Sequence, residues 1–484
     1  MDLLIKATDI HVEHAGRDIL HISNLELYAH DRIGLVGANG AGKSTLLQVL
    51  LGETQPAGCK IQRLGEIAYI KQIDDIDVNA VGDLGVLSRM GLSGINTDNM
   101  SGGEETRAKI AQAFSDGVHA IFADEPTSHL DRGGIDLLVG QIKAFDGAIM
   151  TVSHDRYFLD QVVNKIWELK DGRITEYWGN YSQYRQQKDE EAQRQQDLYD
   201  QAQLERGRLQ RSAEEIRKQS DSKKKQKGVK AFTPNEGGKG HAKSPGTKQK
   251  RASVASQNLE RRAEALSEIA PPERLRTINF RQSSTLMLHN KFPVTGEGIS
   301  LSFGERVIFD HANFTIPLGA KVAFIGDNGT GKTTMLKMIA NRHDNLTISP
   351  KAEFGYFEQT GYKFTTNQSV IAFMEENSDY NQSEIRAVLA SVGFTSQDIK
   401  KSLRVLSGGE IIKLLMSKML LGRYNILLLD EPSNYLDIGS LEALGGMMKA
   451  YAGTIIFVTH DKRLVENVAD LTYEFANGKI TEMI

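Results

Sequence analysis

Short apolar runs recur in two parts of the chain, residues 1–182 and residues 284–484. Runs of this length, rich in Val, Ile, Leu and Phe, are typical of buried strands in a parallel sheet. The runs are 32–36, 121–124, 148–152, 321–325 and 426–430. Both parts of the chain are therefore predicted to be α/β domains.

The residues between these parts have a helical pattern instead. From residue 184 to about residue 222 the chain is rich in Gln, Glu, Arg and Lys, which are good helix formers. Apolar residues at helical spacing form a narrow stripe there: Leu198, Ala202, Leu209, Ala213 and Ile216. A second stripe consists of Leu259, Ala263, Leu266 and Ile269. It stops at Pro271 and Pro272, where a helix has to end.

A loop is predicted between the two stripes, because residues 223–246 contain two prolines and several glycines. Residues 183–283 are therefore expected to form a long α-helical hairpin that links the two domains. A disordered linker is the alternative, since the segment has few apolar residues. The matched stripes favour the hairpin.

Four short motifs occur twice, in the same order. The pairs begin at Gly37 and Gly326, Ser101 and Ser407, Asp124 and Asp430, and His154 and His460. The serine motif precedes the acidic pair by 23 residues in both copies, and the acidic pair precedes the histidine by 30. Residues 1–182 and 284–484 are thus homologous modules. The segment from Gln72 to Ser101 spans 29 residues, against 48 from Gln359 to Ser407, which predicts a smaller helical subdomain in the first module.

Charge is distributed unevenly along the 484 residues, although the formal net charge is only −4. Residues 206–251 hold 15 Lys or Arg and four acidic residues, a net charge of +11. A basic block between acidic flanks is typical of a polyanion-binding segment. A merely solvated charged hairpin is the alternative.

Several classes of protein are excluded by simple features of the sequence. A single cysteine, Cys59, rules out a disulfide framework, a four-cysteine zinc site and an iron–sulfur cluster. The first residues lack the pattern of a secretory signal, and no apolar run is long enough to span a membrane. We therefore expect a cytoplasmic protein without a membrane segment.

Gly-x-x-x-x-Gly-Lys-Ser/Thr is the pattern of a phosphate-binding P-loop, in which backbone N–H groups surround the phosphates at a helix N-terminus. Lys43 and Lys332 are expected to bind the β- and γ-phosphates, and Ser44 and Thr333 to ligate Mg²⁺. The loop residues expected to bind nucleotide are Gly37, Asn39, Gly40, Gly42, Lys43, Ser44 and Thr45, with Gly326, Asn328, Gly329, Gly331, Lys332, Thr333 and Thr334.

Paired acidic residues follow two of the apolar runs. A parallel sheet places Asp124 and Asp430 at its carboxyl edge beside the P-loops, where each can hold Mg²⁺ through water. The adjacent Glu125 and Glu431 are then expected to polarise the attacking water. Taken alone, Asp-Glu-Pro is also compatible with a structural turn.

The P-loop, Gln, Ser-Gly-Gly, Asp-Glu-Pro and Ser/Thr-His-Asp motifs, in this order and twice, resemble those of the ATP-binding cassette (ABC) ATPases. The resemblance implies two tandem ABC-type P-loop nucleotide-binding domains that pair head to tail within one chain, with two ATP molecules between them. It also implies that each P-loop faces the serine motif of the other module, together with Asp131 or Asp437. These motifs are Ser101, Gly102, Gly103 and Glu104, and Ser407, Gly408, Gly409 and Glu410.

The same resemblance implies further site residues. Gln72 and Gln359 contact the nucleotide and its Mg²⁺, and His154 and His460 contact the γ-phosphate. Adenine stacks on an aromatic residue, for which Phe303 fits in the second module, whereas His14 is the equivalent in the first.

Two fused modules, a helical linker with a basic tip and no membrane segment resemble the ABC-F group, whose members act on ribosomes. Residues 240–249 of the linker, residues 100–111 and residues 356–364 are similar to segments of the macrolide–streptogramin B (Msr-type) resistance proteins. This resemblance implies a monomer that binds large-subunit rRNA near the exit- and peptidyl-site tRNAs. Its linker then removes a drug from the exit tunnel, and ATP hydrolysis releases the protein. The expected RNA-contacting residues are Lys223, Lys224, Lys225, Lys227, Lys230, Lys239, His241, Lys243 and Lys248.

Three other functions share part of this pattern. A housekeeping ABC-F translation factor has the same ATPase chemistry. The ATPase subunit of a drug exporter needs a membrane partner and leaves the basic arm unexplained. A DNA-repair or chromosome ATPase needs zinc cysteines or a far longer coiled coil.

Overall fold

The structure of the chain is a computed structural model. It describes residues 2–14, 17–71, 110–111, 113–114, 117–128, 130, 132–227, 245–266, 287–304, 306–358, 364–433 and 436–483. Contacts group the chain into two units, of which one is Met1–Tyr184 with Leu275–Ile484 and the other is Arg185–Arg274.

The first module contains a six-stranded sheet and a smaller antiparallel sheet. The six-stranded sheet has the order β5-β6-β7-β3-β8-β9 and is parallel except for β9, which pairs antiparallel with β8. Its strands are β3 (Arg32–Val36), β5 (Ile67–Ile70), β6 (Ala120–Asp124), β7 (Ala148–Val152), β8 (Lys165–Lys170) and β9 (Arg173–Trp178). The smaller sheet has the order β2-β1-β4, formed by β1 (Leu3–His14), β2 (Arg17–Tyr28) and β4 (Lys60–Arg63). The described helices are α1 (Lys43–Leu51), α4 (Arg132–Ala144) and α5 (Arg156–Val162).

The second module repeats this topology. Its six-stranded sheet has the order β14-β15-β16-β12-β17-β18, and its smaller sheet has the order β11-β10-β13. The strands are β10 (Val294–Phe303), β11 (Arg306–Ile316), β12 (Lys321–Ile325), β13 (Leu346–Ile348), β14 (Phe354–Phe357), β15 (Ile426–Asp430), β16 (Thr454–Val458), β17 (Leu471–Ala476) and β18 (Lys479–Met483).

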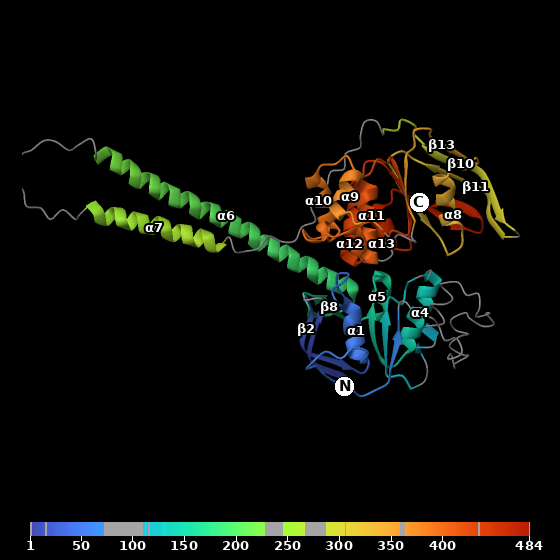
Figure 1. The fold of residues 1–484 in the computed structure, drawn as a ribbon, viewed down its shortest axis with the longest axis horizontal. Coiled ribbons are helices and arrows are strands. Elements are labelled where there is room, and N and C mark those ends of the chain that lie inside the picture. Colours follow the sequence, from blue (N-terminus) through green and yellow to red (C-terminus); the bar gives the residue numbers. More distant parts are fainter. Residues whose placement is uncertain are drawn as a thin grey trace, which may run out of the picture. The chain divides into compact units, whose positions relative to one another are not determined.

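Three helices of the second module lie between β14 and β15 and form a helical subdomain. They are α9 (Val370–Glu376), α10 (Gln382–Ser391) and α11 (Gly408–Leu421), with short 3-10 turns at Asp398–Lys400 and Leu403–Val405. The other helices of this module are α8 (Lys332–Ala340), α12 (Ile438–Ala450) and α13 (Lys462–Val468). Figure 1 shows α9 to α13 gathered on one side of this module, whereas α8, β10 and β11 lie on the other. The smaller subdomain expected between Gln72 and Ser101 lies outside the described residues.

Each large sheet is buried on both faces, which explains why its strands are continuous apolar runs rather than alternating ones. In β6, Ala120 and Phe122 pack toward the smaller sheet and α1, and Ile121 and Ala123 pack toward α4 and α5. In β15, Leu427 and Leu429 similarly face α11 and α12. Burying each large side chain stabilises the sheet by about 1.5–3 kcal/mol. The predicted α/β modules and their parallel sheets are confirmed.

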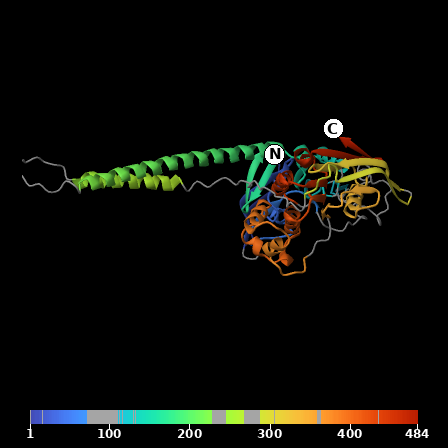
Figure 2. The same ribbon diagram turned by 90° about the horizontal axis from the view of Figure 1, so that it is seen from above.

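The predicted helical hairpin is present as two helices, α6 (Tyr181–Lys227) and α7 (Pro245–Ala265). Figures 1 and 2 show α7 beside the later part of α6. The helix α6 extends to Lys227 because the Lys- and Gln-rich sequence after residue 222 favours a helix. The helix α7 begins inside the expected loop, at Pro245, since the first helical position needs no N–H donor.

The contact between α6 and α7 is made mainly by the small residues of the predicted stripes. Ala202, Ala213 and Ala263 are buried, whereas Leu198 is 59% exposed. The Ser256 hydroxyl donates to the Ala213 carbonyl at 3.3 Å, which requires a close approach of the two helices. Leu198, although it belongs to the predicted stripe, therefore contributes little to the contact.

Candidate active sites

The first P-loop connects β3 to α1 in a conformation that depends on glycine. Gly42 has a φ of 101°, and a Cβ atom there would lie 2.7 Å from the Ile19 side chain. The ammonium of Lys43 donates to the carbonyls of Gly37 at 2.8 Å and Ala38 at 3.1 Å. Burial lowers the pKa of Lys43. The loop thus folds around its lysine, while Asn39 and Gly40 remain exposed.

The second P-loop repeats this geometry between β12 and α8. Gly331 has a φ of 100°, and a Cβ atom there would lie 2.6 Å from the Ile308 side chain. The ammonium of Lys332 donates to the carbonyls of Gly326 at 2.8 Å and Asp327 at 2.6 Å. Positions 327–329 are exposed, and so is Thr333, while Thr45 and Thr334 are partly buried.

A hydroxyl and a carboxylate meet beside each P-loop. Ser44 donates to Asp124 at 2.6 Å, and Thr333 donates to Asp430 at 3.1 Å. Burial raises the pKa of both aspartates. No group of three His, Cys, Asp or Glu side chains suited to a metal occurs among the described residues. A hydroxyl and one carboxylate nevertheless fit Mg²⁺, which takes few protein ligands when nucleotide phosphates supply the others.

Glu125 directly follows β6 in a strained backbone conformation, with a φ of 53°. Its N–H donates to the Val152 carbonyl at 2.9 Å, and its side chain accepts from the His154 N–H at 3.3 Å. Burial, reinforced by the charge of Asp124, raises the pKa of Glu125 to about 8. Its other oxygen, Oε1, accepts no hydrogen bond from the described residues. Strain retained at a buried acid is a feature of functional sites.

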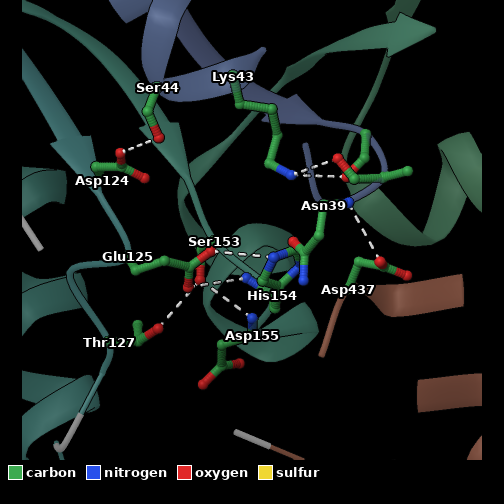
Figure 3. Close-up of polar contacts among 12 residues, drawn as sticks. Asn39, Lys43, Ser44, Asp124, Glu125, Thr127, Ser153, His154, Asp155 and Asp437 are labelled. Carbon is green, nitrogen blue, oxygen red and sulfur yellow. Dashed lines mark hydrogen bonds and ion pairs between the residues drawn. The ribbon is translucent and has the colours of Figure 1, made fainter. Parts of the chain in front are cut away.

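His154 lies against Glu125, as Figure 3 shows, with its Nε2 atom 3.4 Å from Oε1 of Glu125. Burial, with a contribution from Lys43, lowers the pKa of His154 to about 3. At neutral pH the imidazole and the carboxyl are therefore both uncharged, so this contact is not an ion pair. A neutral imidazole can donate a hydrogen bond to an incoming anion without first losing a proton.

The second site has the same acid and histidine. Glu431 has a φ of 49° and lies 3.3 Å from Nε2 of His460. Burial raises its pKa to about 7. The repeated strain, burial and histidine contact indicate the same chemical role in both modules.

The second module also contributes residues to the first P-loop. Asp437, which caps α12, accepts a hydrogen bond from the Asn39 N–H at 3.2 Å (Figure 3). Lys413, buried in α11, donates to the same carboxylate oxygen at 2.8 Å. Burial opposes ionisation of Asp437, but Lys413 holds its pKa well below the usual range. Lys413 was not among the residues expected from the sequence, where it lies in an ordinary helical pattern.

Ser407, Gly408, Gly409 and Glu410 form the start of α11. Ser407 and Glu410 form a capping box, with the Ser407 N–H donating to Glu410 at 2.7 Å and the Glu410 N–H donating to the Ser407 hydroxyl at 3.3 Å. The motif therefore does cap a helix, and it also leaves the N–H groups of a helix N-terminus exposed to an anion.

The other residues expected at the nucleotide sites and in the linker are either exposed or lie outside the part of the chain that the structure describes. Phe303 is 62% exposed at the end of β10, where the ring is accessible for stacking. The following expected residues lie outside the described residues: Gln72, Ser101, Gly102, Gly103, Glu104, Asp131, Gln359, Lys230, Lys239, His241 and Lys243. The side chains of His14, Lys223, Lys224, Lys225, Lys227 and Lys248 likewise lie outside the description.

Replacing Glu125 by Gln is expected to stabilise the nucleotide-free protein in a pH-dependent way. The folded-state pKa of about 8 exceeds the unfolded value of 4.5, so folding favours the protonated acid and stability falls as pH rises between these values. The melting temperature of Glu125→Gln should exceed that of the wild type by about 5 °C at pH 8.5, and by less than about 1 °C at pH 5. Differential scanning calorimetry measures both. An equal difference at the two pH values would contradict the burial of a proton-binding carboxyl, and the exposed Glu13→Gln variant serves as the control.

Comparison with known proteins agrees with this geometry. A family model described as "ABC transporter" matches residues 20–128 and 309–434, and a second model with the same description matches residues 167–234. The erythromycin resistance ATP-binding protein MsrA of Staphylococcus epidermidis is 34% identical over 482 residues, covering 98% of each chain. The ribosome protection protein VmlR of Bacillus subtilis (strain 168) is 29% identical over 494 residues, covering 100% of this chain and 89% of VmlR.

Solved structures share the fold. The RNase-L inhibitor matches with a TM-score of 0.64 at 18% identity, over 98% of this chain and 91% of that chain. The archaeal ribosome recycling factor aABCE1, in its complex with the stalk protein aP1, matches with a TM-score of 0.63 at 18% identity, over 98% and 90%. None of the described helices combines the length and the apolar character needed to cross a membrane.

Two phosphate loops, each with a strand-end aspartate, a buried glutamate and a histidine, define a protein with two nucleotide-binding ABC modules. The chain belongs to the ABC-F family of ABC ATPases, in the antibiotic-resistance group that includes MsrA and VmlR. Its ABC modules make it an ATP hydrolase.

Proposed function

We propose that this cytoplasmic protein binds ribosomes in an ATP-dependent way and protects them from macrolide- and streptogramin-type drugs. The observation that carries the proposal is the 34% identity to an erythromycin resistance protein along 98% of both chains, linker included. The basic block at residues 206–251 supports an RNA partner, because clustered Lys and Arg bind phosphates.

In each site the P-loop binds the phosphates of ATP. Its exposed N–H groups and its buried lysine, Lys43 or Lys332, neutralise negative charge. Ser44 with Asp124, and Thr333 with Asp430, would hold Mg²⁺, which polarises the phosphate oxygens when bound. We assign Gln72 and Gln359 to the same metal and nucleotide by family resemblance, and Phe303 to adenine.

Hydrolysis is assigned to the buried glutamates. Oε1 of Glu125 has no hydrogen-bond donor among the described residues, so it is available to accept the proton of an attacking water. Burial raises the pKa of Glu125 to about 8, so a minor ionised fraction is present at neutral pH. In that fraction the carboxylate is a stronger base than that of an exposed glutamate. His154 donates to the γ-phosphate from its neutral imidazole. Glu431 and His460 have the same roles in the second site.

Closure of the two modules follows from shared nucleotide contacts. The hydrogen bond from Asn39 to Asp437 supports a composite site built from the first P-loop and the second module. Ser407, Gly408, Gly409 and Glu410 would complete this site, and Ser101, Gly102, Gly103 and Glu104 the other. A ligand that contacts both modules favours the closed state by its differential affinity.

The first turn of the linker helix is positioned to respond to this closure. Asp160 accepts hydrogen bonds from the N–H and the hydroxyl of Ser182, both at 2.6 Å. Arg463, from α13 of the second module, donates to the same Ser182 hydroxyl at 2.9 Å. Tyr181 and Tyr184 pack in the core of the first module, which fixes the start of α6 there. Both modules therefore contact the base of the helix that carries the basic tip.

The linker is the part assigned to the ribosome. Near the tRNA exit site its tip would extend toward the peptidyl site, contact large-subunit rRNA and tRNA, and cause a drug in the exit tunnel to dissociate. Basic residues supply affinity by contacts with phosphates, and ATP hydrolysis releases the protein. The boundaries 1–182, 183–283 and 284–484 remain our proposed division of the chain.

A drug-susceptibility experiment tests this proposal against its main rival. Expression in a susceptible Gram-positive host should raise the inhibitory concentration of erythromycin by several doubling dilutions, because the drug is removed from ribosomes. The Lys43→Ala, Lys332→Ala variant, which lacks both phosphate-binding lysines, is the control and should give no protection. Unchanged susceptibility to macrolides and streptogramin B with a well-expressed protein would instead favour a housekeeping ABC-F translation factor.

A further inference from the structure

A small ion-pair network lies beside the serine motif of the second module. The ammonium of Lys401 is 3.1 Å from Oε1 of Glu410 and 2.7 Å from Oδ1 of Asp398. Asp398 is held in turn by the N–H of Thr395 at 2.9 Å and by its hydroxyl at 2.6 Å. The lysine is therefore fixed between two carboxylates, of which one belongs to the motif.

The capping box at the start of α11 leaves one hydrogen of the serine motif, the hydroxyl proton of Ser407, available to donate to a ligand. The Ser407 hydroxyl oxygen accepts from the Glu410 N–H, so the hydroxyl proton is not used in this bond. The Ser407 residue is exposed, and the N–H groups of the first turn of α11 lie next to it. This end of the helix can therefore donate to an anion through the hydroxyl and the backbone together.

Glu410 creates an electrostatic problem for such an anion. Burial opposes its ionisation, but hydrogen bonds from Ser407 and Lys401 hold the pKa of Glu410 below its ordinary value. A negative carboxylate thus lies in the same turn that would receive a phosphate, and like charges at close range repel. Lys401 supplies the compensating positive charge to one oxygen, while the Ser407 N–H binds the other.

The sequence before the serine motif of the first module contains no counterpart of Lys401. Glu104 occupies the position that corresponds to Glu410, but the ten residues 94–103 before it contain no Lys or Arg. They fall in the segment that is shorter in the first module. Lys401 is therefore a feature of the serine motif at Ser407 that the sequence before the motif at Ser101 does not repeat.

We propose that Lys401 is a positioning residue for ATP hydrolysis: it neutralises and orients Glu410 so that the Ser407 end of α11 can accept the γ-phosphate of ATP bound to the first P-loop. The inference rests on the proposed pairing of the first P-loop with the serine motif of the second module. Nine residues before Glu104 the first module has Ile95, so a lysine at this position is specific to the serine motif of the second module.

Steady-state ATPase kinetics of the full-length protein test this role. A Glu431→Gln background restricts turnover to the site that uses Glu125. There, Lys401→Met should raise KM for ATP about fivefold, because an uncompensated charge weakens phosphate binding, with kcat changed less than about twofold. Lys401→Arg should retain the parental KM. The matched control is Lys400→Met, since Lys400 is exposed one residue earlier and forms no ion pair with the described residues.

A double variant separates charge compensation from simple support of the fold. Lys401→Met combined with Glu410→Gln removes the carboxylate that needs compensation, so KM should return toward the parental value. A raised KM that persists in the double variant would overturn the proposal, as would a parental KM in Lys401→Met itself. Melting temperatures within about 2 °C of the parent verify that each variant is folded.

Ser407→Ala distinguishes this proposal from the one on which it rests. If Ser407→Ala raises KM and Lys401→Met does not, the composite site stands and the role of Lys401 is wrong. If Ser407→Ala leaves both kcat and KM unchanged, the pairing of the first P-loop with this motif fails, and the role of Lys401 fails with it.

Discussion

ATP turnover should fall by about 100-fold or more when Glu125 and Glu431 are both replaced by Gln, because a positioned general base contributes at least this factor. Both glutamates are buried at the end of a strand, in a strained conformation, and in contact with a histidine. Gln has nearly the same shape but cannot accept a proton from water. The P-loop lysines are untouched, so nucleotide should still bind.

Two readouts make this result specific to the proposed base. Phosphate release measures the loss of turnover, and equilibrium binding of labelled ATP measures whether the nucleotide remains bound. The Glu13→Gln, Glu482→Gln variant is the matched control, since it changes one exposed glutamate in each module and should keep wild-type turnover. A double variant at Glu125 and Glu431 that hydrolyses ATP at the wild-type rate would remove both glutamates from the mechanism.

The second large effect concerns the linker. Replacing Lys223, Lys224, Lys225 and Lys227 by Gln should weaken ribosome binding and lower the slope of log K against log salt by about 3, because each lost phosphate contact removes one released counterion. These residues belong to the block of 15 basic residues and lie at the C-terminal end of α6.

Binding measured at several potassium concentrations gives the slope directly. The control variant carries Gln at four exposed lysines of the ATPase modules, which changes the net charge equally. They are Lys60, Lys143, Lys351 and Lys449. If the linker variant keeps the wild-type slope of log K against log salt, the linker lysines do not contact RNA. The same conclusion follows if the slope falls equally in the linker variant and the control variant.

The parts of this structure that the sequence predicts are those governed by local rules. Buried parallel strands require continuous apolar runs, so β6 and β15 and their terminal aspartates could be located from sequence. The P-loops could be located because only glycine tolerates the conformations at Gly42 and Gly331. The helical hairpin was predictable from its stripes, although the burial of alanine instead of Leu198 depends on how closely the helices approach.

The features that could not be predicted from the sequence depend on contacts between residues distant in the chain. Lys413 joins Asp437, and Arg463 joins Ser182, which lies 281 positions earlier. Although the family resemblance points to Asp437, no periodicity or motif marks Lys413, Arg463 or Ser182, because each looks like an ordinary polar residue of a helix. The pKa of Glu125 is similarly inaccessible from sequence, since it results from burial rather than from its neighbours alone.

The central claim is that ATP held in both sites creates the form of the protein that binds ribosomes. Ribosome co-sedimentation of the Glu125→Gln, Glu431→Gln variant tests it most directly, with ATP, with ADP and without nucleotide. We expect the variant to pellet with ribosomes in ATP and to remain in the supernatant in the other two conditions. Absence from the ribosome pellet in all three conditions, or equal pelleting in all three, would contradict the account.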